Sequence, residues 1–543
     1  KGVPIFYTPY FSHADPSVKY KTGLLFPTFG TLNSELFYMQ PVYWNISAHE
    51  DATFTPIYAN EQAMLGLEYR KQIKNGSLFV EGALSQAQND ANTNDKDQSG
   101  PIGFAHVKGE INFNPQWRSH FDVGATNDRE FLGDNPLWPG LSSSLINNKV
   151  TLEGFNNHNY INASTLWYQE LDTGDETDHP VILPELSYHG VSDADAIGGR
   201  FNYMAGLRQY GKSSIIESGQ RLNLEGKYTL PLLLPKGIMT TSEVNLRGDL
   251  YHTDFTEEGL ESSDHYKDGS AHRLVPRANI DVRYPFMRQT DYGNQVAEPV
   301  MALFIAPNDA GNDKAIGNTD SSLFENDDSN LMSMDRIPGL DRIEEGSRLV
   351  VGGNFSHFFK DGKKIQAFAG QSFELAEDNV LDEELGINAS DDQIVGRVNL
   401  NLDNFGDYYY RFNLSSEDQS ILKNELNFNL GSPAFRVSGG YSYVNKQIST
   451  NSNNYERVHG SLSSQLNDRW KASATSSFDM YEDRSISNTL GLIYEDECFI
   501  FTSNLSNKYY EDEQDEQAVM FSLTFKTVGS FQSAPISTRT EEE

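Results

Sequence analysis

The chain has 543 residues, with 42 basic and 77 acidic side chains and a formal net charge of −35. This excess of acid argues against a general nucleic-acid binder, because contact with phosphate requires the opposite sign. The mean hydropathy is −0.54, and no run approaches the roughly 18 apolar residues that a membrane-spanning helix needs. A membrane-spanning strand needs only about 9–11 residues, with alternate ones apolar, so the composition fits a membrane barrel. A large secreted β-protein fits it equally well.

The chain opens with two strand-like segments that are each interrupted by a proline. Residues Gly23–Gly30 contain Pro27, and residues Leu36–Ile46 contain Pro41. Proline has no N–H to give to a ladder, so within sheets it is confined to edges, strand starts and bulges. Two consecutive strands that both carry one predict a weak seam that opens sideways. Protection of an edge against aggregation is the alternative reading.

Alternation of apolar and polar residues continues from residue 22 to about residue 527. In segment 518–526 one face is apolar and the other is small or polar, which is typical of strands between lipid and a wet lumen; the apolar residues are Val519, Phe521, Leu523 and Phe525. At roughly 20–22 residues per strand and connection, the chain makes about 26 strands. We therefore predict an all-β protein, a large transmembrane antiparallel β-barrel with a lateral seam between its first and last strands. Ordinary sandwich strands with a solvated face are the alternative.

The lumen of so large a barrel is too wide for its own side chains to fill, so it is an open channel or it holds a plug. The sequence shows no N-terminal globular segment that would serve as a plug, and we expect a separate protein inside. The long connections carry the acidic residues, for example the stretch from Asn308 to Asp328. We interpret them as exposed, solubilising loops, with divalent-cation bridging at the outer rim as the alternative.

The sequence offers no motif for catalysis. It contains no His-Glu-x-x-His, nucleophile-elbow, dinucleotide-binding or phosphate-loop pattern and no cysteine pair for zinc. The stretch Asp90–Asp97 is rich in oxygen ligands but lacks the glycine of an EF-hand loop. We expect a protein that is not an enzyme, with no cofactor and no metal site. The single cysteine, Cys498, shares the parity of the polar residues nearby, so its side chain is expected to point inward.

Several short stretches are individually weak signals but stand in a recognisable order over some 500 residues: Val3–Phe11, Gly23–Pro27, Tyr43–Ile46, Asp51–Pro56, Leu183–Leu186, Ala297–Val300, Asp341–Gly346 and Gly370–Phe373, with Cys498 near the end. In this order they resemble the LptD family of LPS-assembly proteins. The resemblance implies an outer-membrane translocon of a Gram-negative bacterium. Such a protein receives lipopolysaccharide from a periplasmic bridge and inserts it into the outer leaflet through a lateral gate in the barrel.

The resemblance also implies roles for individual residues. Pro27 and Pro41 are expected to form the lateral gate, and Cys498 is expected to form a disulfide with a cysteine of the N-terminal region. Phe499 stands where other members have a second cysteine, so only one such bridge is expected. Residues 1–20 are expected to be the exit segment from a periplasmic β-jellyroll domain that is missing here. Residues 21–531 are then the barrel, and residues 532–543 are a C-terminal tail.

The partners implied by the resemblance are an LptE-like lipoprotein plug inside the barrel and an LptA-like periplasmic bridge, reached through the missing N-terminal domain. The substrate is lipopolysaccharide, and no nucleic acid is expected. The alternative function is a general outer-membrane channel or receptor-type transporter. That alternative predicts a constriction loop or an N-terminal plug, and the sequence gives no sign of either.

Overall fold

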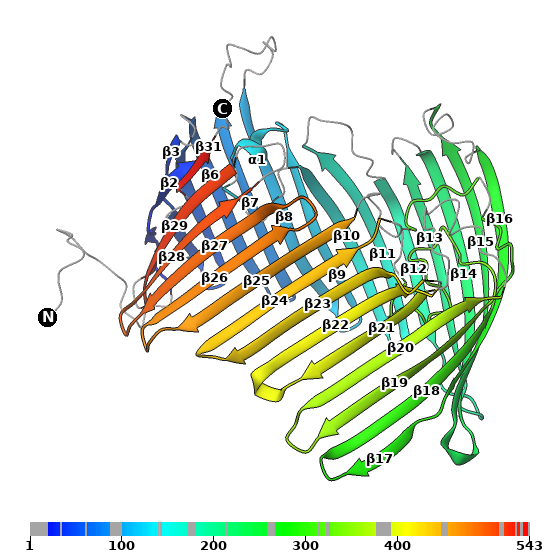
Figure 1. Cartoon of the computed structure of the whole chain (residues 1–543). Helices are drawn as coiled ribbons and strands as arrows, with labels where there is room; N and C mark the ends of the chain where they lie inside the picture. The colour runs from blue at the N-terminus through cyan, green and yellow to red at the C-terminus, as the bar shows by residue number, and fades with distance from the viewer. Residues whose placement is uncertain are drawn as a thin grey trace.

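The structure is a computed structural model. It describes residues 20–32, 35–59, 62–86, 100–135, 137–138, 141, 144–171, 181–211, 216–257, 267–312, 315–321, 326–375, 393–416, 418–446, 454–509, 515–526, 529–532 and 536–540. These residues form one antiparallel sheet of 31 strand segments, curved so that the N-terminal and C-terminal strands face each other (Figure 1). The prediction of an all-β protein built on a very large antiparallel sheet is confirmed.

The N-terminal part of the sheet begins with four short segments and continues with longer strands. The segments are β1 (Gly23–Leu24), β2 (Thr28–Leu32), β3 (Glu35–Met39), β4 (Val42–Ser47), β5 (Glu50–Ala59), β6 (Gln62–Ile73), β7 (Gly76–Gln86), β8 (Pro101–Asn114), β9 (Trp117–Thr126), β10 (Leu145–Asn156), β11 (Asn159–Glu170) and β12 (Val181–Val191).

The middle of the sheet holds the longest strands. They are β13 (Arg200–Gly211), β14 (Ile216–Leu233), β15 (Met239–Phe255), β16 (Gly269–Arg283), β17 (Phe286–Thr290), β18 (Gly293–Ile305), β19 (Arg348–Phe359), β20 (Lys364–Glu374) and β21 (Gln393–Asn401). A turn of 3-10 helix, η1 (Pro235–Gly237), joins β14 to β15, and a second, η2 (Asp403–Phe405), joins β21 to β22.

The C-terminal part of the sheet contains the last ten strand segments in the chain. It comprises β22 (Gly406–Ser415), β23 (Ile421–Ser432), β24 (Phe435–Val444), β25 (Tyr455–Gln465), β26 (Trp470–Asp479), β27 (Arg484–Glu495), β28 (Phe499–Lys508), β29 (Asp515–Phe525), β30 (Gly529–Gln532) and β31 (Ile536–Thr540). Strand β31 pairs with β29, so the sheet extends beyond residue 531, where the sequence predicts the barrel to end.

Several segments continue one another along one strand position. Segments β1 and β2 together form the first strand. It pairs with the second strand, which β3 and β4 form. Both β16 and β17 pair with β18, and both β30 and β31 pair with β29. Counting these four pairs of segments as single strands, the sheet agrees with the prediction of about 26 strands.

The connections alternate in length and so define two ends of the sheet. Tight turns such as Lys74–Asn75 between β6 and β7 lie at one end, which we call the short-turn end. The long connections, such as residues 306–347 between β18 and β19, lie at the other, which we call the long-loop end. This asymmetry is typical of membrane barrels, whose turns on one side are short and whose loops on the other are long.

The two faces of the sheet differ in polarity, as β15 illustrates. Arg247 and Asp249 are buried on the inner face, whereas Leu246 and Leu250 are 49% and 56% exposed on the outer face. Because successive side chains of a strand point to opposite faces, the alternation of the sequence becomes an apolar exterior and a polar interior. An apolar exterior of this kind suits contact with lipid.

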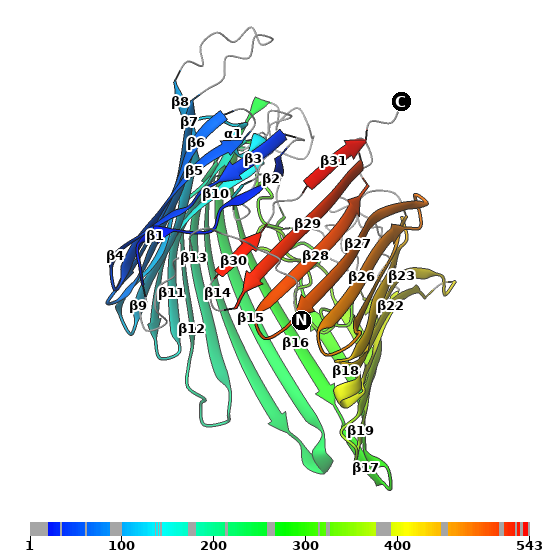
Figure 2. The same ribbon diagram turned by 90° about the vertical axis from the view of Figure 1, so that its left-hand side faces the viewer.

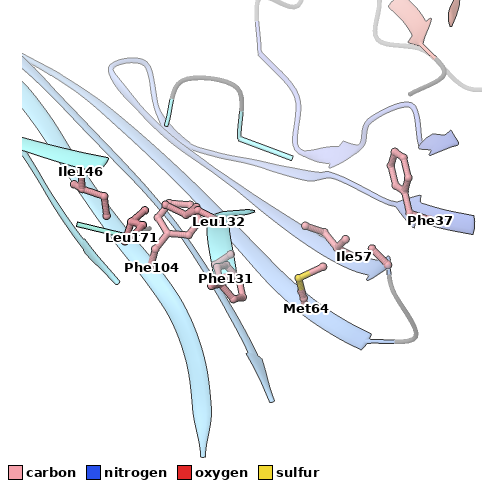
Figure 3. Packing of buried hydrophobic residues seen from close by; sticks show 10 residues of the cluster. Phe37, Ile57, Met64, Phe104, Phe131, Leu132, Ile146 and Leu171 are labelled. Carbon is pink, nitrogen blue, oxygen red and sulfur yellow. The ribbon is translucent and has the colours of Figure 1, made fainter. Parts of the chain in front are cut away.

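A small hydrophobic core covers the inner face near the long-loop end of β3 and β5–β8 (Figure 3). Its cover is the short helix α1 (Phe131–Asp134), whose Phe131 and Leu132 are buried. Phe131 lies against Phe104 of β8, with ring centroids 6.1 Å apart, and Phe37 of β3 belongs to the same cluster. The connection between β9 and β10 therefore folds inward and packs beside the first strands.

Among the described residues, no helix has the length and apolar character needed to cross a bilayer.

Candidate functional site: an interrupted seam and an inward-folded loop

The two prolines that predict a weak seam both fall in breaks between strand segments. Pro27 lies in the break between β1 and β2, and Pro41 lies in the break between β3 and β4. The break has a physical cause, since a proline cannot donate to a ladder and its ring fixes φ. The lateral gate itself stays a prediction, but the structure brings the two prolines to adjacent positions in the sheet.

The register shows how the two breaks face each other. Leu24 is opposite Val42, and Thr28 is opposite Met39. Three residues, 25–27, therefore oppose two, 40–41, which is the residue count of a β-bulge. A single backbone hydrogen bond spans this part, from the N–H of Leu25 to the carbonyl of Pro41 at 2.9 Å. A bulge with few ladder bonds is a place where the first strand can bend.

A third proline extends the line of breaks, and sequence reasoning missed its role. Pro56 lies on the outer face of β5, beside the break between β3 and β4. Its carbonyl accepts a hydrogen bond from the N–H of Gln40 at 3.0 Å. Pro56 donates no hydrogen bond to Gln40 in return, because proline has no N–H. The signal was present in the sequence, since three prolines recur at intervals of 14 and 15 residues.

The other side of the seam is formed by β29, β30 and β31. Strand β2 approaches β30 and β31, and Figure 2 shows these segments facing β1–β4 across the seam. In the described residues no backbone ladder joins β1 or β2 to β30 or β31. The first and last strands therefore meet without the ladder that joins neighbouring strands elsewhere in the sheet.

The outer surface beside the seam is apolar. Leu24, Leu36 and Trp44 are 73%, 77% and 48% exposed. Such exposure has a high cost in water, about 25 cal/mol for each Å² of apolar surface, and none in lipid. The exposed apolar surface beside the seam is therefore suited to contact with lipid.

Cys498 lies in the turn between β27 and β28 at the short-turn end, and its side chain is exposed. Cys498 lies outside the strand whose parity predicted its direction, because Asp496 organises a turn by accepting the N–H groups of Cys498 and Phe499. The carbonyl of Cys498 accepts a hydrogen bond from the N–H of Lys526, 3.0 Å away, just after β29. An exposed thiol beside the last strands is accessible to a partner cysteine, and the disulfide stays a prediction.

A second part of the site is the connection between β18 and β19, residues 306–347, which we call the inward loop; the structure describes it except for residues 313–314 and 322–325. It folds against the inner face of the long strands and is held by buried ion pairs. Asp320 of the loop pairs with Arg221 of β14 at 2.6 Å and with Arg208 of β13 at 3.0 Å. Arg221 also pairs with Asp341 at 2.6 Å, and that carboxylate is completely buried.

The carboxylates of this cluster accept hydrogen bonds from the loop itself as well as from the inner face of β13–β16, which we call the wall. Asp320 accepts the N–H groups of Leu340 and Asp341 at 2.9 and 3.0 Å. Asp341 accepts both the N–H and the hydroxyl of Thr319. Buried charges are stable only when they are paired and their remaining lone pairs are occupied. The loop thus supplies the bonds that make its own acidic residues tolerable in the interior.

Two more arginines bind a backbone carbonyl of the loop. Arg247 of β15 and Arg273 of β16 both donate to the carbonyl of Leu340, and Asp249 holds the Nε of each at 3.0 and 2.6 Å. Five wall residues of this kind share the inward parity of β13–β16 and are buried: Arg208, Arg221, Arg247, Arg273 and Arg277. The planar guanidinium suits such multiple contacts better than an ammonium group does.

The C-terminal part of the loop is fixed in the same way. Glu344 pairs with Arg336 and with Arg348, each at 2.8 Å. On the opposite side, Asp328 pairs with Arg411 of β22 at 3.0 Å and also contacts Arg397 of β21. The loop is therefore anchored from β13 round to β22 across the interior of the sheet.

The pKa values of the loop carboxyls show which groups the site keeps charged. Burial by itself raises the pKa of Asp320, but the charge of Arg221, the Leu340 N–H and Arg208 outweigh it and lower that pKa to about 2. Glu344 has a lowered pKa for the same reason, since Arg336 and Arg348 outweigh its burial. Asp335 has a raised pKa, because its burial outweighs the attraction of Arg277.

These contacts correct two expectations. The acidic stretch from Asn308 to Asp328 is not simply an exposed, solubilising loop, because Asp320 and Asp328 are paired with inward arginines. The expectation that the chain has no constriction loop is also wrong, since the inward loop occupies part of the interior. The sequence signal that could have found this anchor is the regular recurrence of arginine on one face of β14, β15 and β16.

Within the described ranges, no cluster of three or more His, Cys, Asp or Glu side chains is arranged to hold a metal ion.

The curved antiparallel sheet, its apolar exterior and its charged interior define a large β-barrel membrane protein with an interrupted seam. The LptD family model, described as LPS transport system D, matches residues 102–470. The chain belongs to the LptD family. This family consists of non-enzymatic transport proteins, which agrees with the expectation from the motifs. Family and fold together locate the chain in the outer membrane of a Gram-negative bacterium.

Individual relatives agree with this assignment. The LPS-assembly protein LptD of Actinobacillus pleuropneumoniae serotype 7 is 26% identical over 399 residues, which are 70% of this chain and 50% of the relative. The LptD of Pasteurella multocida is 25% identical over 534 residues, 92% of this chain and 66% of the relative. The chain thus spans half to two thirds of the length of these relatives.

Among solved structures, the ferric preacinetobactin receptor of Acinetobacter baumannii aligns with 95% of this chain and 78% of its own, at 10% identity and a TM-score of 0.27. A likeness this low carries no argument here.

Proposed function

We propose that this chain is the membrane portion of a transporter that receives lipopolysaccharide from a periplasmic bridge and inserts it into the outer leaflet through its seam. The observation that carries the proposal is the interrupted ladder at the first strands. Pro27 and Pro41 both lie in the bulge between the first and second strands, and in the described residues the first strand has no ladder to the last.

A physical argument connects that seam to an amphiphilic substrate. Moving several acyl chains through a water-filled pore would expose them at a cost of about 0.8 kcal/mol for each CH₂ group. A lateral opening lets the chains enter the bilayer while the sugars stay in a polar lumen. Each seam hydrogen bond contributes about 1 kcal/mol net in water, and more in lipid, so a few absent donors lower the cost of opening by several kcal/mol.

The names of the relatives support this choice of substrate, since the matching proteins are LPS-assembly proteins. By the same reasoning we expect an LptE-like lipoprotein inside the barrel and an LptA-like bridge on the periplasmic side. The position of Cys498 supports the bridge to the N-terminal region. Its exposed thiol lies at the short-turn end, near which the described chain begins at Tyr20.

A general channel or receptor-type transporter is the second candidate. The observation that favours it is the inward loop, which narrows part of the interior as a constriction loop would. The two candidates differ at the seam, because a channel has no use for a weakened ladder. Co-purification from outer membranes separates them. A stoichiometric lipoprotein with bound lipopolysaccharide supports the transporter, and an empty, ion-conducting barrel supports the channel.

The decisive test restores the absent donors. In the double variant Pro27→Ala with Pro41→Ala, two backbone N–H groups become available at the bulge between the first two strands. We therefore expect the first strand to bend away from the last strand less readily and less lipopolysaccharide to reach the cell surface. The matched control is Pro276→Ala, which changes an outward proline of β16 far from the seam. Surface lipopolysaccharide is measured in cells that depend on the variant. Unchanged surface lipopolysaccharide in the double variant would contradict the proposal.

A further inference from the structure

Gln40 lies between two of the three prolines, Pro41 and Pro56. Its backbone N–H donates to the carbonyl of Pro56 at 3.0 Å. Its neighbour Pro41 accepts the N–H of Leu25 at 2.9 Å. Gln40, in the second strand, therefore lies between Pro41 of the same strand and Pro56 of the neighbouring strand β5.

The bulge leaves one backbone acceptor without its usual donor. Two residues that face each other as a hydrogen-bonded antiparallel pair exchange two bonds, one in each direction. The N–H of Leu25 reaches Pro41, but Pro41 has no N–H to return, so the carbonyl of Leu25 lacks its ladder partner. The side chain of Gln40 supplies that donor. Its Nε2 lies 2.8 Å from the Leu25 carbonyl and 3.2 Å from the Pro41 carbonyl.

The apolar surroundings of this side-chain amide make its replacement of the missing backbone donor important. Gln40 has the outward parity of Leu36, Tyr38 and Trp44, which are exposed on the apolar face of the sheet. In lipid an unpaired amide or carbonyl costs several kcal/mol because no water replaces the lost partner. The oxygen of Gln40 is also satisfied, since Oε1 accepts the hydroxyl of Tyr38 at 3.0 Å. Both ends of the amide therefore have hydrogen-bond partners.

We propose that Gln40 is a side-chain clasp that holds the first strand to the second across the proline bulge. It replaces the backbone donor that Pro41 lacks, so β1 and β4 move as one unit. The seam then opens between the first and last strands and not between the first and second. This inference rests on the proposed function for its consequence in transport, but the clasp itself is a property of the ladder and is measured without substrate. Gln40 is a positioning residue in this scheme.

Hydrogen exchange of the full chain in lipid nanodiscs tests the clasp. Gln40→Leu keeps the bulk of the side chain and removes the donor, so we expect the amides of residues 22–28 to exchange about tenfold faster, as the loss of one hydrogen bond predicts. The control is Gln72→Leu, which removes a similar amide bond, Nε2 to the carbonyl of Gly76 at 3.0 Å, at the short-turn end. It should leave residues 22–28 unchanged.

A second variant separates the clasp from simple packing. Pro41→Ala restores a backbone N–H next to the Leu25 carbonyl, so the amide of Gln40 becomes dispensable. We expect Gln40→Leu to accelerate exchange in the native background and to have little effect in the Pro41→Ala background. An equal acceleration in both backgrounds would show a packing role and overturn the clasp, as would no acceleration in either. If Gln40→Leu alone fails to fold, recovery of the barrel by adding Pro41→Ala supports the clasp, and failure to recover it overturns the clasp.

The outcome is distinguishable from a failure of the proposed function. If the proline double variant leaves surface lipopolysaccharide unchanged while Gln40→Leu accelerates exchange, the clasp stands and the gate is wrong. If the proline variant blocks transport while exchange at residues 22–28 does not respond to Gln40→Leu, the gate stands and the clasp is wrong.

Discussion

The wall of β13–β16 and the first strands beside the seam, β1–β4, are parts of one sheet, but different interactions stabilise them. The wall has long strands, with 18 residues in β14 and 17 in β15, and its inner face is tied to the inward loop by buried ion pairs. The first strands are made of segments of 2, 5, 5 and 6 residues, interrupted by prolines. One side of the barrel is thus continuous and cross-linked, and the other is segmented.

This difference has a physical consequence for how the barrel can move. Buried arginine–carboxylate pairs resist any change that leaves a charge unpaired, because an unpaired buried charge costs several kcal/mol. A proline bulge resists bending much less, because few ladder bonds have to break. Deformation of the barrel is therefore concentrated at the seam, while the wall and the inward loop keep their arrangement.

The largest expected effect comes from breaking the wall. Arg221→Ala leaves Asp341 buried and deprived of its arginine, and removal of one partner of a buried pair costs about 3–5 kcal/mol. We expect residues 315–321 and 326–346 of the inward loop to lose protection from hydrogen exchange. The control is Arg70→Ala, whose partner Asp51 is 2.9 Å away but whose own side chain is 52% exposed; it should cost less than about 1 kcal/mol. Equal effects would refute the claim that burial makes the wall pairs strong.

Acidification should loosen the same loop with a defined sign. The folded pKa of Asp320 is lowered from 3.8 to about 2, so its contribution is fully present above pH 4 and is lost as the pH falls towards 2. The shift corresponds to a stabilisation on the order of 2 kcal/mol. Asp335, with its raised pKa, works in the opposite direction.

Hydroxyl-radical footprinting at pH 7, 4 and 2 measures this loosening. Met332 and Met334 pack against the core under the loop and should become more oxidised between pH 4 and pH 2. Met480, which is 47% exposed, serves as the internal reference. Oxidation of the loop methionines that is flat across this range would argue against an electrostatic anchor.

The smallest effect is expected at the seam. The hydroxyl of Thr22 accepts the N–H of Asn45 at 3.0 Å, just before β1 begins. Thr22→Ala removes an exposed bond worth about 1 kcal/mol or less, so residues 20–26 should exchange a few times faster while the inward loop stays unchanged. Thr22→Ser keeps the hydroxyl and should behave like the native chain. A response in the inward loop would mean that the seam and the wall are coupled after all.

Much of the sheet could be predicted because its signal is local. A strand sends successive side chains to opposite faces, so Phe521, Leu523 and Phe525 lie on one face wherever β29 is placed. The breaks at Pro27 and Pro41 follow from the chemistry of one residue type and needed no knowledge of the fold. The turn around Cys498 was missed because Asp496 captures two N–H groups there, which period-two alternation does not register.

The sequence alone determined the fold class, the apolar and polar faces and the position of the weakened strands, because each depends on residues close together in the chain. Tertiary structure alone decided two other features. The acidic stretch of the inward loop became an anchor because the curved sheet brings Arg221 within 2.6 Å of Asp320, 99 residues away. Gln40 became a clasp because the bulge places the Leu25 carbonyl, 15 residues away, within 2.8 Å of its amide. Partners so distant in sequence are selected by strand pairing and register, which no local pattern encodes.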